Sequence, residues 1–174
     1  MHKIKIRQSL DTDMPAIERL YPAAFPDEDL LPLVRHLLMH EPGISSLVAE
    51  AGQTLAGHIL FTLCGISGSD IQAALLAPLA VAPGHQRQGI GTALIREGLQ
   101  QLRSAGVDQV FVLGDPAYYG RSGFEPETGV APPYPLPEQW RQAWQSLRLG
   151  SALPPTQGEL LLPEAWMQPA LWGP

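Results

Sequence analysis

The stretch Val81-Ala82-Pro83-Gly84-His85-Gln86-Arg87-Gln88-Gly89-Ile90-Gly91-Thr92 decides how this chain is expected to fold. The residues from Leu75 to Val81 are mostly apolar and predict a strand, and the apolar residues after Thr92 recur at helical spacing. The stretch is therefore predicted to be a turn that opens an amphipathic helix. The first N–H groups of a helix lack intrahelical partners and carry roughly half a positive charge, so this turn suits an anion such as phosphate.

Two familiar phosphate-binding motifs do not fit the turn. A Walker loop needs Gly-Lys-Ser/Thr, and the only lysines of the chain are Lys3 and Lys5. A dinucleotide fingerprint needs a third glycine or alanine and a later acidic residue, and Ala93 and Asp108 lie at the wrong spacing from Gly89. The pattern that does fit is Gln/Arg-x-x-Gly-x-Gly/Ala, present here as Gln86-Arg87-Gln88-Gly89-Ile90-Gly91.

This string resembles the acetyl-CoA loop of the GNAT superfamily of N-acetyltransferases. The resemblance implies an α+β fold, a three-layer α/β sandwich whose mixed, mostly antiparallel sheet of about seven strands is flanked by helices and splayed between strands 4 and 5. Pro78 agrees with a splayed strand, because proline cannot donate to a fully paired ladder. On this resemblance a main-chain N–H near Val81 holds the thioester carbonyl, and acetyl-CoA is bound by Leu79, Ala80, Val81, Gln86, Arg87, Gln88, Gly89, Ile90, Gly91, Thr92 and Tyr119.

A second motif, Leu113 to Phe124, follows the predicted strand Gln109 to Leu113. Many GNAT proteins have a tyrosine four residues before a Gly-Phe pair, and Tyr119 stands in that position before Gly123-Phe124. The preceding Leu-Gly-Asp-Pro-Ala resembles the YhbS-like branch of predicted acetyltransferases. The resemblance implies that Tyr119 is the general acid that protonates the departing thiolate, since a phenol with a pKa near 10 keeps its proton. The alternative for Tyr119 is a packed aromatic side chain whose hydroxyl satisfies a backbone group.

The sequence identifies a general base less clearly. A lysine-like acceptor with a pKa of about 10.4 is almost entirely protonated at neutral pH, whereas an α-amine near 7.8 is already partly neutral. The predicted strand from Gln72 to Val81 contains no carboxylate. Glu28, in the acidic turn Asp27-Glu28-Asp29, and Glu50, at a strand end, are the candidates, and the alternative is that both are solvated surface charges.

Composition excludes several other functions. The net charge of −6 and the two lysines argue against a nucleic-acid surface and suit a cationic amine. The single cysteine, Cys64, excludes an internal disulfide and has no histidine or carboxylate beside it that would make it a nucleophile. His36 and His40 lack a third ligand at metal-site spacing, so we expect no metal. The chain has no apolar run long enough for a membrane span, and a cytoplasmic protein is expected.

We expect one domain over residues 1–174, with a proline-rich C-terminal part from about residue 126. In that part the sequence predicts a helix near residues 137–149, because Trp140, Ala143, Trp144 and Leu147 would share one face. That face is expected to be core or acceptor-site wall, or else a dimer contact. The other elements expected are strands at 2–7, 46–50, 55–64 and 159–162 and helices from Met14 to Pro26 and over 28–40.

The function expected from these motifs is direct transfer of acetyl from acetyl-CoA to a primary amine, carried by a small molecule or a peptide. Two alternatives stay open. The domain either binds acyl-CoA as a sensor without turnover, or it uses a longer acyl-CoA as donor. The sequence does not name the acceptor and allows a monomer or a homodimer.

Overall fold

The computed structural model describes residues 3–150 and 155–173 of the chain. These residues group into two units. Unit 1 consists of the described residues up to Phe61 together with Ala77–Gln100, and unit 2 consists of Thr62–Leu76 and the described residues from Gln101 onward. The strands β3 (Thr54–Ile66) and β4 (Ala73–Val81) and the helix α3 (Ile90–Ser104) each run through both units.

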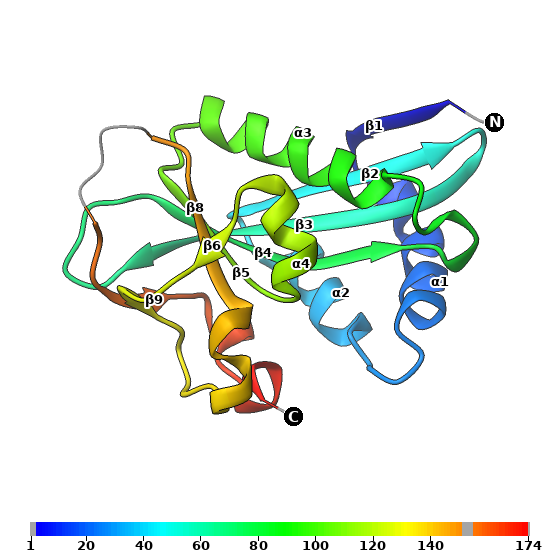
Figure 1. Cartoon of the computed structure of the whole chain (residues 1–174). Helices are drawn as coiled ribbons and strands as arrows, with labels where there is room; N and C mark the ends of the chain where they lie inside the picture. The colour runs from blue at the N-terminus through cyan, green and yellow to red at the C-terminus, as the bar shows by residue number, and fades with distance from the viewer. Residues whose placement is uncertain (1–2, 151–154, 174) are drawn as a thin grey trace. The chain divides into compact units, whose positions relative to one another are not determined.

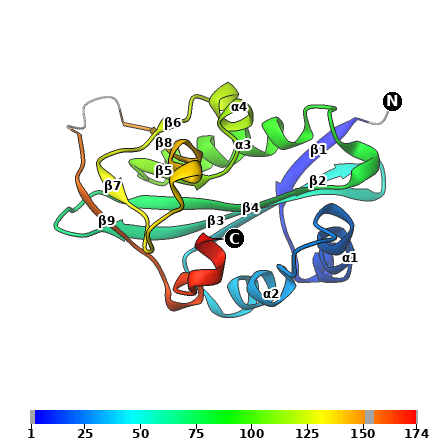
Figure 2. The same cartoon turned by 60° about the horizontal axis from the view of Figure 1, so that its bottom comes forward.

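Unit 1 places helices on both faces of its strands. Its strand order is β1-β2-β3-β4, and β1 pairs antiparallel with β2 from Ile4↔Ala51 to Gln8↔Leu47. Helices α1 and α2 lie on one face of these strands and α3 lies on the other (Figures 1 and 2). Besides parts of β3, β4 and α3, the unit contains β1 (Ile4–Gln8), η1 (Asp11–Asp13), α1 (Met14–Ala24), α2 (Leu31–His40), β2 (Ile44–Ala51) and η2 (Pro83–His85).

The core of unit 1 forms from the apolar faces that the sequence period predicts. Helix α1 buries Ile17, Leu20 and Tyr21, and α3 buries Leu94 and Ile95. Helix α3 also approaches β3 closely, since a Cβ at Gly98 would collide with the ring of Phe61. Only glycine allows this contact between helix and strand.

A hydrogen-bonded chain of polar side chains crosses the same core. His58 on β3 is 0% exposed, and its Nδ1 lies 2.7 Å from the Tyr21 hydroxyl while its Nε2 lies 2.8 Å from Ser46 Oγ. Ser46 Oγ lies 2.6 Å from Ser9 Oγ, which continues the chain. Burial lowers the pKa of His58 to about 3 and raises the pKa of Tyr21 well above its usual value. Both side chains are therefore neutral at physiological pH.

Unit 2 is built from shorter segments. Its strand order is β4-β5-β8-β6, and β9 pairs with β3 and with β7, which is labelled beside it in Figure 2. Its elements, besides parts of β3, β4 and α3, are β5 (Gln109–Leu113), α4 (Pro116–Tyr119), η3 (Gly120–Ser122), β6 (Glu125–Pro126), β7 (Val130–Ala131), η4 (Glu138–Ala143), β8 (Trp144–Arg148), β9 (Gly158–Leu161), η5 (Glu164–Trp166) and η6 (Pro169–Trp172).

The parallel pair β4-β5 confirms the expected splayed sheet. The two strands pair from Ala73↔Gln109 to Leu75↔Phe111, and the pairing stops there although β4 continues to Val81. Apart from the parallel pairs β4-β5 and β7-β9, the strand registers described are antiparallel. The described residues contain nine strands rather than about seven, because β6 and β7 are two-residue strands in the proline-rich part.

The helix predicted near residues 137–149 is wrong for its second half, and its first half is a 3₁₀ helix rather than an α-helix. Residues Glu138–Ala143 form a six-residue 3₁₀ helix, and Trp144–Arg148 form strand β8, which pairs with all of β5. The Trp144 ring stacks on Phe111 of β5, with ring centroids 5.5 Å apart, and the Trp144 indole N–H donates to the Val130 carbonyl at 2.8 Å. Trp140 is only half-buried. Pairing with β5 therefore outweighs the local helical pattern.

Smaller differences concern element ends. Helix α2 begins at Leu31 rather than Glu28, and Pro32 lies in its first turn, where proline is favoured. The acidic turn Asp27-Glu28-Asp29 therefore precedes the helix. Strand β1 begins at Ile4, and the His2 end of the predicted first strand lies outside the described residues.

Candidate functional site

The turn between β4 and α3, in unit 1, has the backbone of an anion site. Arg87 has φ +62° and Gly89 has φ +81°, and both residues are exposed. A left-handed residue such as Arg87 is uncommon outside glycine and is a sign of a functional turn. Left-handed residues in a tight turn can direct neighbouring N–H groups toward one concavity, a geometry that suits phosphate groups.

The start of α3 adds further donors to this turn. The bond from the Ala93 N–H to the Gly89 carbonyl, 3.0 Å long, opens the helix. The N–H groups of Ile90, Gly91 and Thr92 precede that bond and have no partner within the helix. No Cβ contact would arise at Gly89, so the space in front of it is open. These backbone groups fit a pyrophosphate.

The side chains of the turn have mixed roles. The Gln86 amide donates to the Val81 carbonyl at 3.2 Å, which ties the turn to the end of β4. Arg87 and Gln88 are exposed, whereas Ile90 and Gly91 are buried at the helix start. Of the predicted residues on β4, Ala80 is buried, and Leu79 and Val81 are half-buried. The groups of the turn that are open to a ligand are therefore mainly its backbone N–H groups and the exposed Arg87 side chain.

Tyr119 ends the short helix α4 in unit 2. Asp115 begins the helix, since its carboxylate accepts the Ala117 N–H at 2.9 Å, and Gly123 ends the following turn with φ +99°. The Tyr119 ring contacts Phe124 edge to face, with centroids 5.9 Å apart, and covers Gly114, where a Cβ would collide with it. Its hydroxyl has no hydrogen bond to any residue within 3–150 or 155–173.

The phenol of Tyr119 keeps its proton in this environment. Burial raises the pKa of Tyr119 well above its usual value near 10, and the neighbouring Tyr118 raises it further. The phenol therefore holds its proton over the whole physiological pH range. Since no protein group in the described part of the chain accepts that proton, the hydroxyl is available to a bound molecule.

The two predicted carboxylates have different surroundings within unit 1. Glu50 Oε1 accepts two hydrogen bonds from the Arg7 guanidinium, at 2.8 and 2.6 Å, and Arg7 also binds Asp13. These hydrogen bonds raise the pKa of Arg7 above its usual value. They lower the pKa of Asp13 below its usual value. Glu28 is exposed and lies beside Tyr21 and Phe25 in a pocket of about 280 Å³. Its carboxylate has no partner among the described residues.

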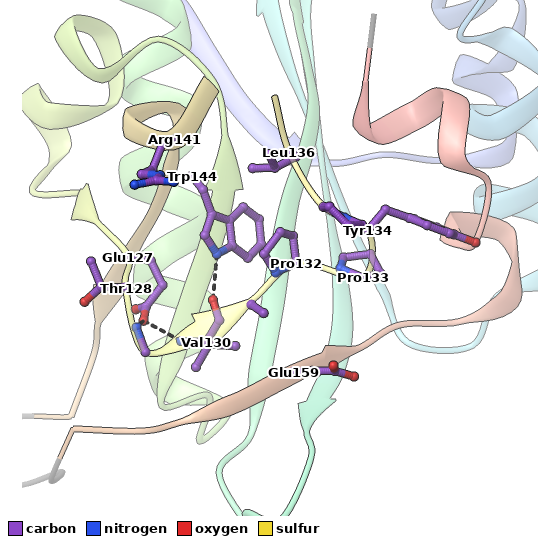
Figure 3. A pocket seen from close by; sticks show the side chains of 13 residues that line it. Glu127, Thr128, Val130, Pro132, Pro133, Tyr134, Leu136, Arg141, Trp144 and Glu159 are labelled. Carbon is purple, nitrogen blue, oxygen red and sulfur yellow. Dashed lines mark hydrogen bonds between the residues drawn. The ribbon is translucent and has the colours of Figure 1, made fainter. Parts of the chain in front are cut away.

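A larger pocket in unit 2 includes Trp144, but its other lining residues were not predicted from the sequence. It has a volume of about 560 Å³ and is formed by residues 127–136 together with Arg141, Trp144 and Glu159. Figure 3 shows the Trp144 ring and the run Pro132-Pro133-Tyr134 around it. Trp140, which the predicted helix would place beside Trp144, does not line this pocket. The run Pro132-Pro133-Tyr134-Pro135 is the only local sign of a rigid wall in that part of the sequence.

A comparison with known protein families shows where the chain belongs. The profile of the Acetyltransferase (GNAT) family matches residues 10–124. The chain belongs to the GNAT family of acetyltransferases. The match includes the turn at Arg87 and Gly89 as well as the segment from Tyr119 to Phe124 of this GNAT protein. The family assignment made from the two motifs is confirmed.

Relatives place the protein near one branch of the family. The uncharacterized N-acetyltransferase YjhQ of Escherichia coli K12 is 43% identical over 120 residues, which cover 64% of this chain and 66%, just under two thirds, of YjhQ. The uncharacterized N-acetyltransferase YhbS of the same strain is 36% identical over 124 residues, which cover 69% of this chain and 72% of YhbS.

Solved structures confirm the fold. The crystal structure of Escherichia coli YhbS in complex with CoA matches with a TM-score of 0.86 and 30% identity, covering 97% of this chain and 94% of that chain. A GNAT acetyltransferase from Brucella melitensis in complex with acetyl-CoA matches with a TM-score of 0.77 and 32% identity, covering 95% and 99%. The GNAT fold class and the YhbS-like branch are therefore confirmed.

Two further features concern residues 3–150 and 155–173. None of the helices there combines the length and the apolar character that crossing a membrane requires. In the same part of the chain, His, Cys, Asp and Glu side chains do not gather in groups of three or more suited to a metal ion.

Proposed function

We propose that this GNAT protein transfers the acetyl group of acetyl-CoA directly to a primary amine. The observation that carries the proposal is the turn at Arg87 and Gly89, whose two left-handed residues and helix start suit the pyrophosphate of CoA. Support comes from relatives at 30% and 32% identity, since the structure of YhbS contains CoA and that of the Brucella melitensis protein contains acetyl-CoA.

The reaction makes one bond and breaks one. The neutral amine nitrogen attacks the thioester carbonyl carbon, the C–N bond forms, and the C–S bond then breaks. The amine nitrogen loses one proton, and the departing thiolate gains one. The protein therefore has to supply a proton at sulfur and remove one from nitrogen, and general acid and base groups typically accelerate such steps by about 10²- to 10⁴-fold.

We assign the proton donor to Tyr119. Its hydroxyl is unpartnered within the described residues, and burial keeps it protonated. For proton removal we assign Glu28 in preference to Glu50, because the Glu50 carboxylate is occupied by Arg7 whereas that of Glu28 has no partner in the described part of the chain. An α-amine, which is partly neutral at pH 7, needs this base less than a lysine-like amine does.

The deciding experiment is the substitution Tyr119→Phe, assayed by thiol release from acetyl-CoA across a panel of amines. We expect kcat to fall by about 100-fold or more while acetyl-CoA binding, measured by calorimetry, changes little. Tyr118→Phe is the matched control, since it removes a hydroxyl from the adjacent ring. It should retain activity close to that of the unchanged protein.

Two outcomes would contradict the proposal. Equal activity of Tyr119→Phe and the unchanged protein would remove Tyr119 as the acid. Binding of acetyl-CoA without thiol release for any amine would favour a sensor that binds acyl-CoA without turnover. Replacing acetyl-CoA by longer acyl-CoA donors in the same assay separates an acetyltransferase from an acyltransferase of different chain length.

A further inference from the structure

Gly114, the residue that follows strand β5, lies in contact with the ring of Tyr119. A Cβ atom at Gly114 would lie 2.4 Å from Tyr119 Cε2 and 3.4 Å from Cζ, the carbon that bears the hydroxyl. Ordinary contacts begin at 3.4 Å, so a side chain at Gly114 would displace the ring by about 1 Å. The hydroxyl half of the Tyr119 ring therefore rests on the bare backbone of Gly114.

The backbone of Gly114 is held in turn by the segment that begins β8. The Gly114 N–H donates to the Ala143 carbonyl at 2.9 Å. The side-chain amide of Gln145 donates to the Gly114 carbonyl at 3.0 Å and to the Ala143 carbonyl at 3.3 Å. In the part of the chain that the structure describes, no other donor reaches the Gly114 carbonyl. Gln145, which is 1% exposed, thus fixes the backbone on which the Tyr119 ring rests.

The direction of the Gln145 side chain agrees with this role. Successive residues of a strand point to opposite faces, so Gln145 and Leu147 share the face of β8 that Trp144 does not use. A Cβ at Gly123 would lie 3.2 Å from Leu147 Cδ1, which places the turn that follows Tyr119 on that face. The Gln145 amide and the Tyr119 turn therefore lie on the same side of the β5-β8 pair.

The main chain of Tyr119 is fixed separately from its ring. The Tyr119 N–H donates to the Asp115 carbonyl at 3.0 Å, and the Tyr119 carbonyl accepts the Phe124 N–H at 3.3 Å. The Tyr119 hydroxyl makes no hydrogen bond to any residue that the structure describes. Packing alone therefore sets the position of the hydroxyl, and the contact with Gly114 is the closest to its oxygen-bearing end.

From these contacts we infer that Gly114 and Gln145 are positioning residues for the proposed acid: Gln145 holds the Gly114 backbone, and Gly114 sets the place of the Tyr119 hydroxyl. The inference rests on the proposed role of Tyr119 and adds two residues that act through it. A general acid must lie within hydrogen-bond reach of the atom that it protonates, and a misplacement of about 1 Å can cost about 100-fold in rate.

Gly114→Ala tests the ring contact. The φ of Gly114 is not positive, so the effect of the added methyl comes from the Tyr119 ring rather than from backbone strain. We expect kcat for thiol release to fall by about 100-fold, with KM for acetyl-CoA within about twofold of its usual value. Gly120→Ala is the matched control, because Gly120 has φ −57° and its added Cβ would meet no atom. It should keep kcat.

Gln145→Leu tests the amide and keeps a side chain of similar size. We expect kcat to fall by about tenfold with little change in KM for acetyl-CoA. Gln109→Leu is the matched control, since Gln109 is also 1% exposed and its amide donates to Glu127 and Ser146. This control removes a buried amide of the same unit and should keep kcat within about twofold.

The same substitutions in the Tyr119→Phe background separate positioning from a general structural effect. A residue that acts through the phenol has nothing left to position once the hydroxyl is gone. Gly114→Ala and Gln145→Leu should therefore lower kcat by less than about twofold in that background. Losses as large as in the unchanged protein would overturn the inference.

Fluorine NMR of protein that contains 3-fluorotyrosine reports the position of the ring without turnover. The chain has four tyrosines, and the Tyr119 signal is the one that Tyr119→Phe removes. We expect Gly114→Ala and Gln145→Leu to shift this signal and Gln109→Leu to leave it in place. Shifted signals together with normal kcat in Tyr119→Phe would support the contacts assigned to Gly114 and Gln145 and contradict the proposed acid. An unshifted Tyr119 signal in Gln145→Leu would overturn the inference.

Discussion

Units 1 and 2 reach a stable core by different routes. Unit 1 buries the periodic faces of long elements such as α1 and α3 and holds one polar chain through His58. Unit 2 joins short strands and 3₁₀ turns through tryptophans: Trp144 contacts Trp172 edge to face, and the Trp166 indole donates to Thr62 at 3.1 Å. The turn from Val81 to Thr92, the proposed acetyl-CoA site, belongs to unit 1, and the pocket formed around Trp144 belongs to unit 2.

The difference explains where sequence patterns are reliable. A long helix or strand shows its buried face repeatedly along the sequence, so its period identifies it. A two- to five-residue segment has no such repeat, and its structure depends on partners elsewhere in the chain. Segments of this kind therefore cannot be recognised from their own sequence pattern, whereas the turn from Val81 to Thr92 can.

Trp144 provides the strongest test of this comparison. Trp144→Ala removes the stacking on Phe111 and the bond to Val130, and we expect the free energy of unfolding to fall by about 3–5 kcal/mol. Trp140→Ala, at a half-buried position, should lower it by about 1 kcal/mol or less. Urea unfolding monitored by circular dichroism measures both. Equal losses would instead favour the helix that the sequence predicts, on which both rings share one face.

The buried His58 makes the stability of unit 1 sensitive to acid. Its folded pKa of about 3 lies below the ordinary value of 6.5, so the unfolded chain binds more protons between these two values. Stability should therefore fall as the pH drops from about 6.5 toward 3, with a slope of up to about 1.4 kcal/mol per pH unit from this one group. The lowered pKa of Asp13 adds a loss only below its usual range, near pH 4.

The matched variant for this effect is His58→Gln, which keeps polar groups at the site but does not titrate. Urea unfolding at several pH values between about 6.5 and 4.5 should give a flatter dependence for this variant than for the unchanged protein. Identical slopes in both proteins would mean that His58 is not the group responsible.

The smallest expected effect concerns the turn from Val81 to Thr92, where acetyl-CoA is proposed to bind. Gly89→Ala forces a side chain onto a residue with φ +81°, and we expect a loss of about 1–2 kcal/mol from backbone strain, since the added Cβ meets no atom. Gly84→Ala, also in open space but without a positive φ, should change stability by less than about 0.5 kcal/mol. Calorimetry should also detect weaker acetyl-CoA binding for Gly89→Ala alone. Equal effects of the two substitutions would contradict the special role of Gly89.

Two segments of the proposed acetyl-CoA site were predictable from the sequence. The turn Val81 to Thr92 and the strand Gln109–Leu113 appear where the pattern predicts them, and the two motifs are sufficient by themselves to indicate the family. They were predictable because glycine, proline and hydrophobic period act locally, within a few residues. The roles of Tyr119, Glu28 and the residues of the turn remain predictions.

Only the tertiary structure decided the conformation of residues 144–148 and the partners of the carboxylates. It made Trp144–Arg148 a strand, because pairing with β5 and stacking on Phe111 stabilise that segment more than a helix of its own would. In the folded chain Arg7, on a neighbouring strand, binds the Glu50 carboxylate. Folding also places Glu159 in the same pocket as the run Pro132 to Pro135. These contacts join residues far apart in sequence, and their energies depend on burial and distance, which sequence spacing alone does not specify.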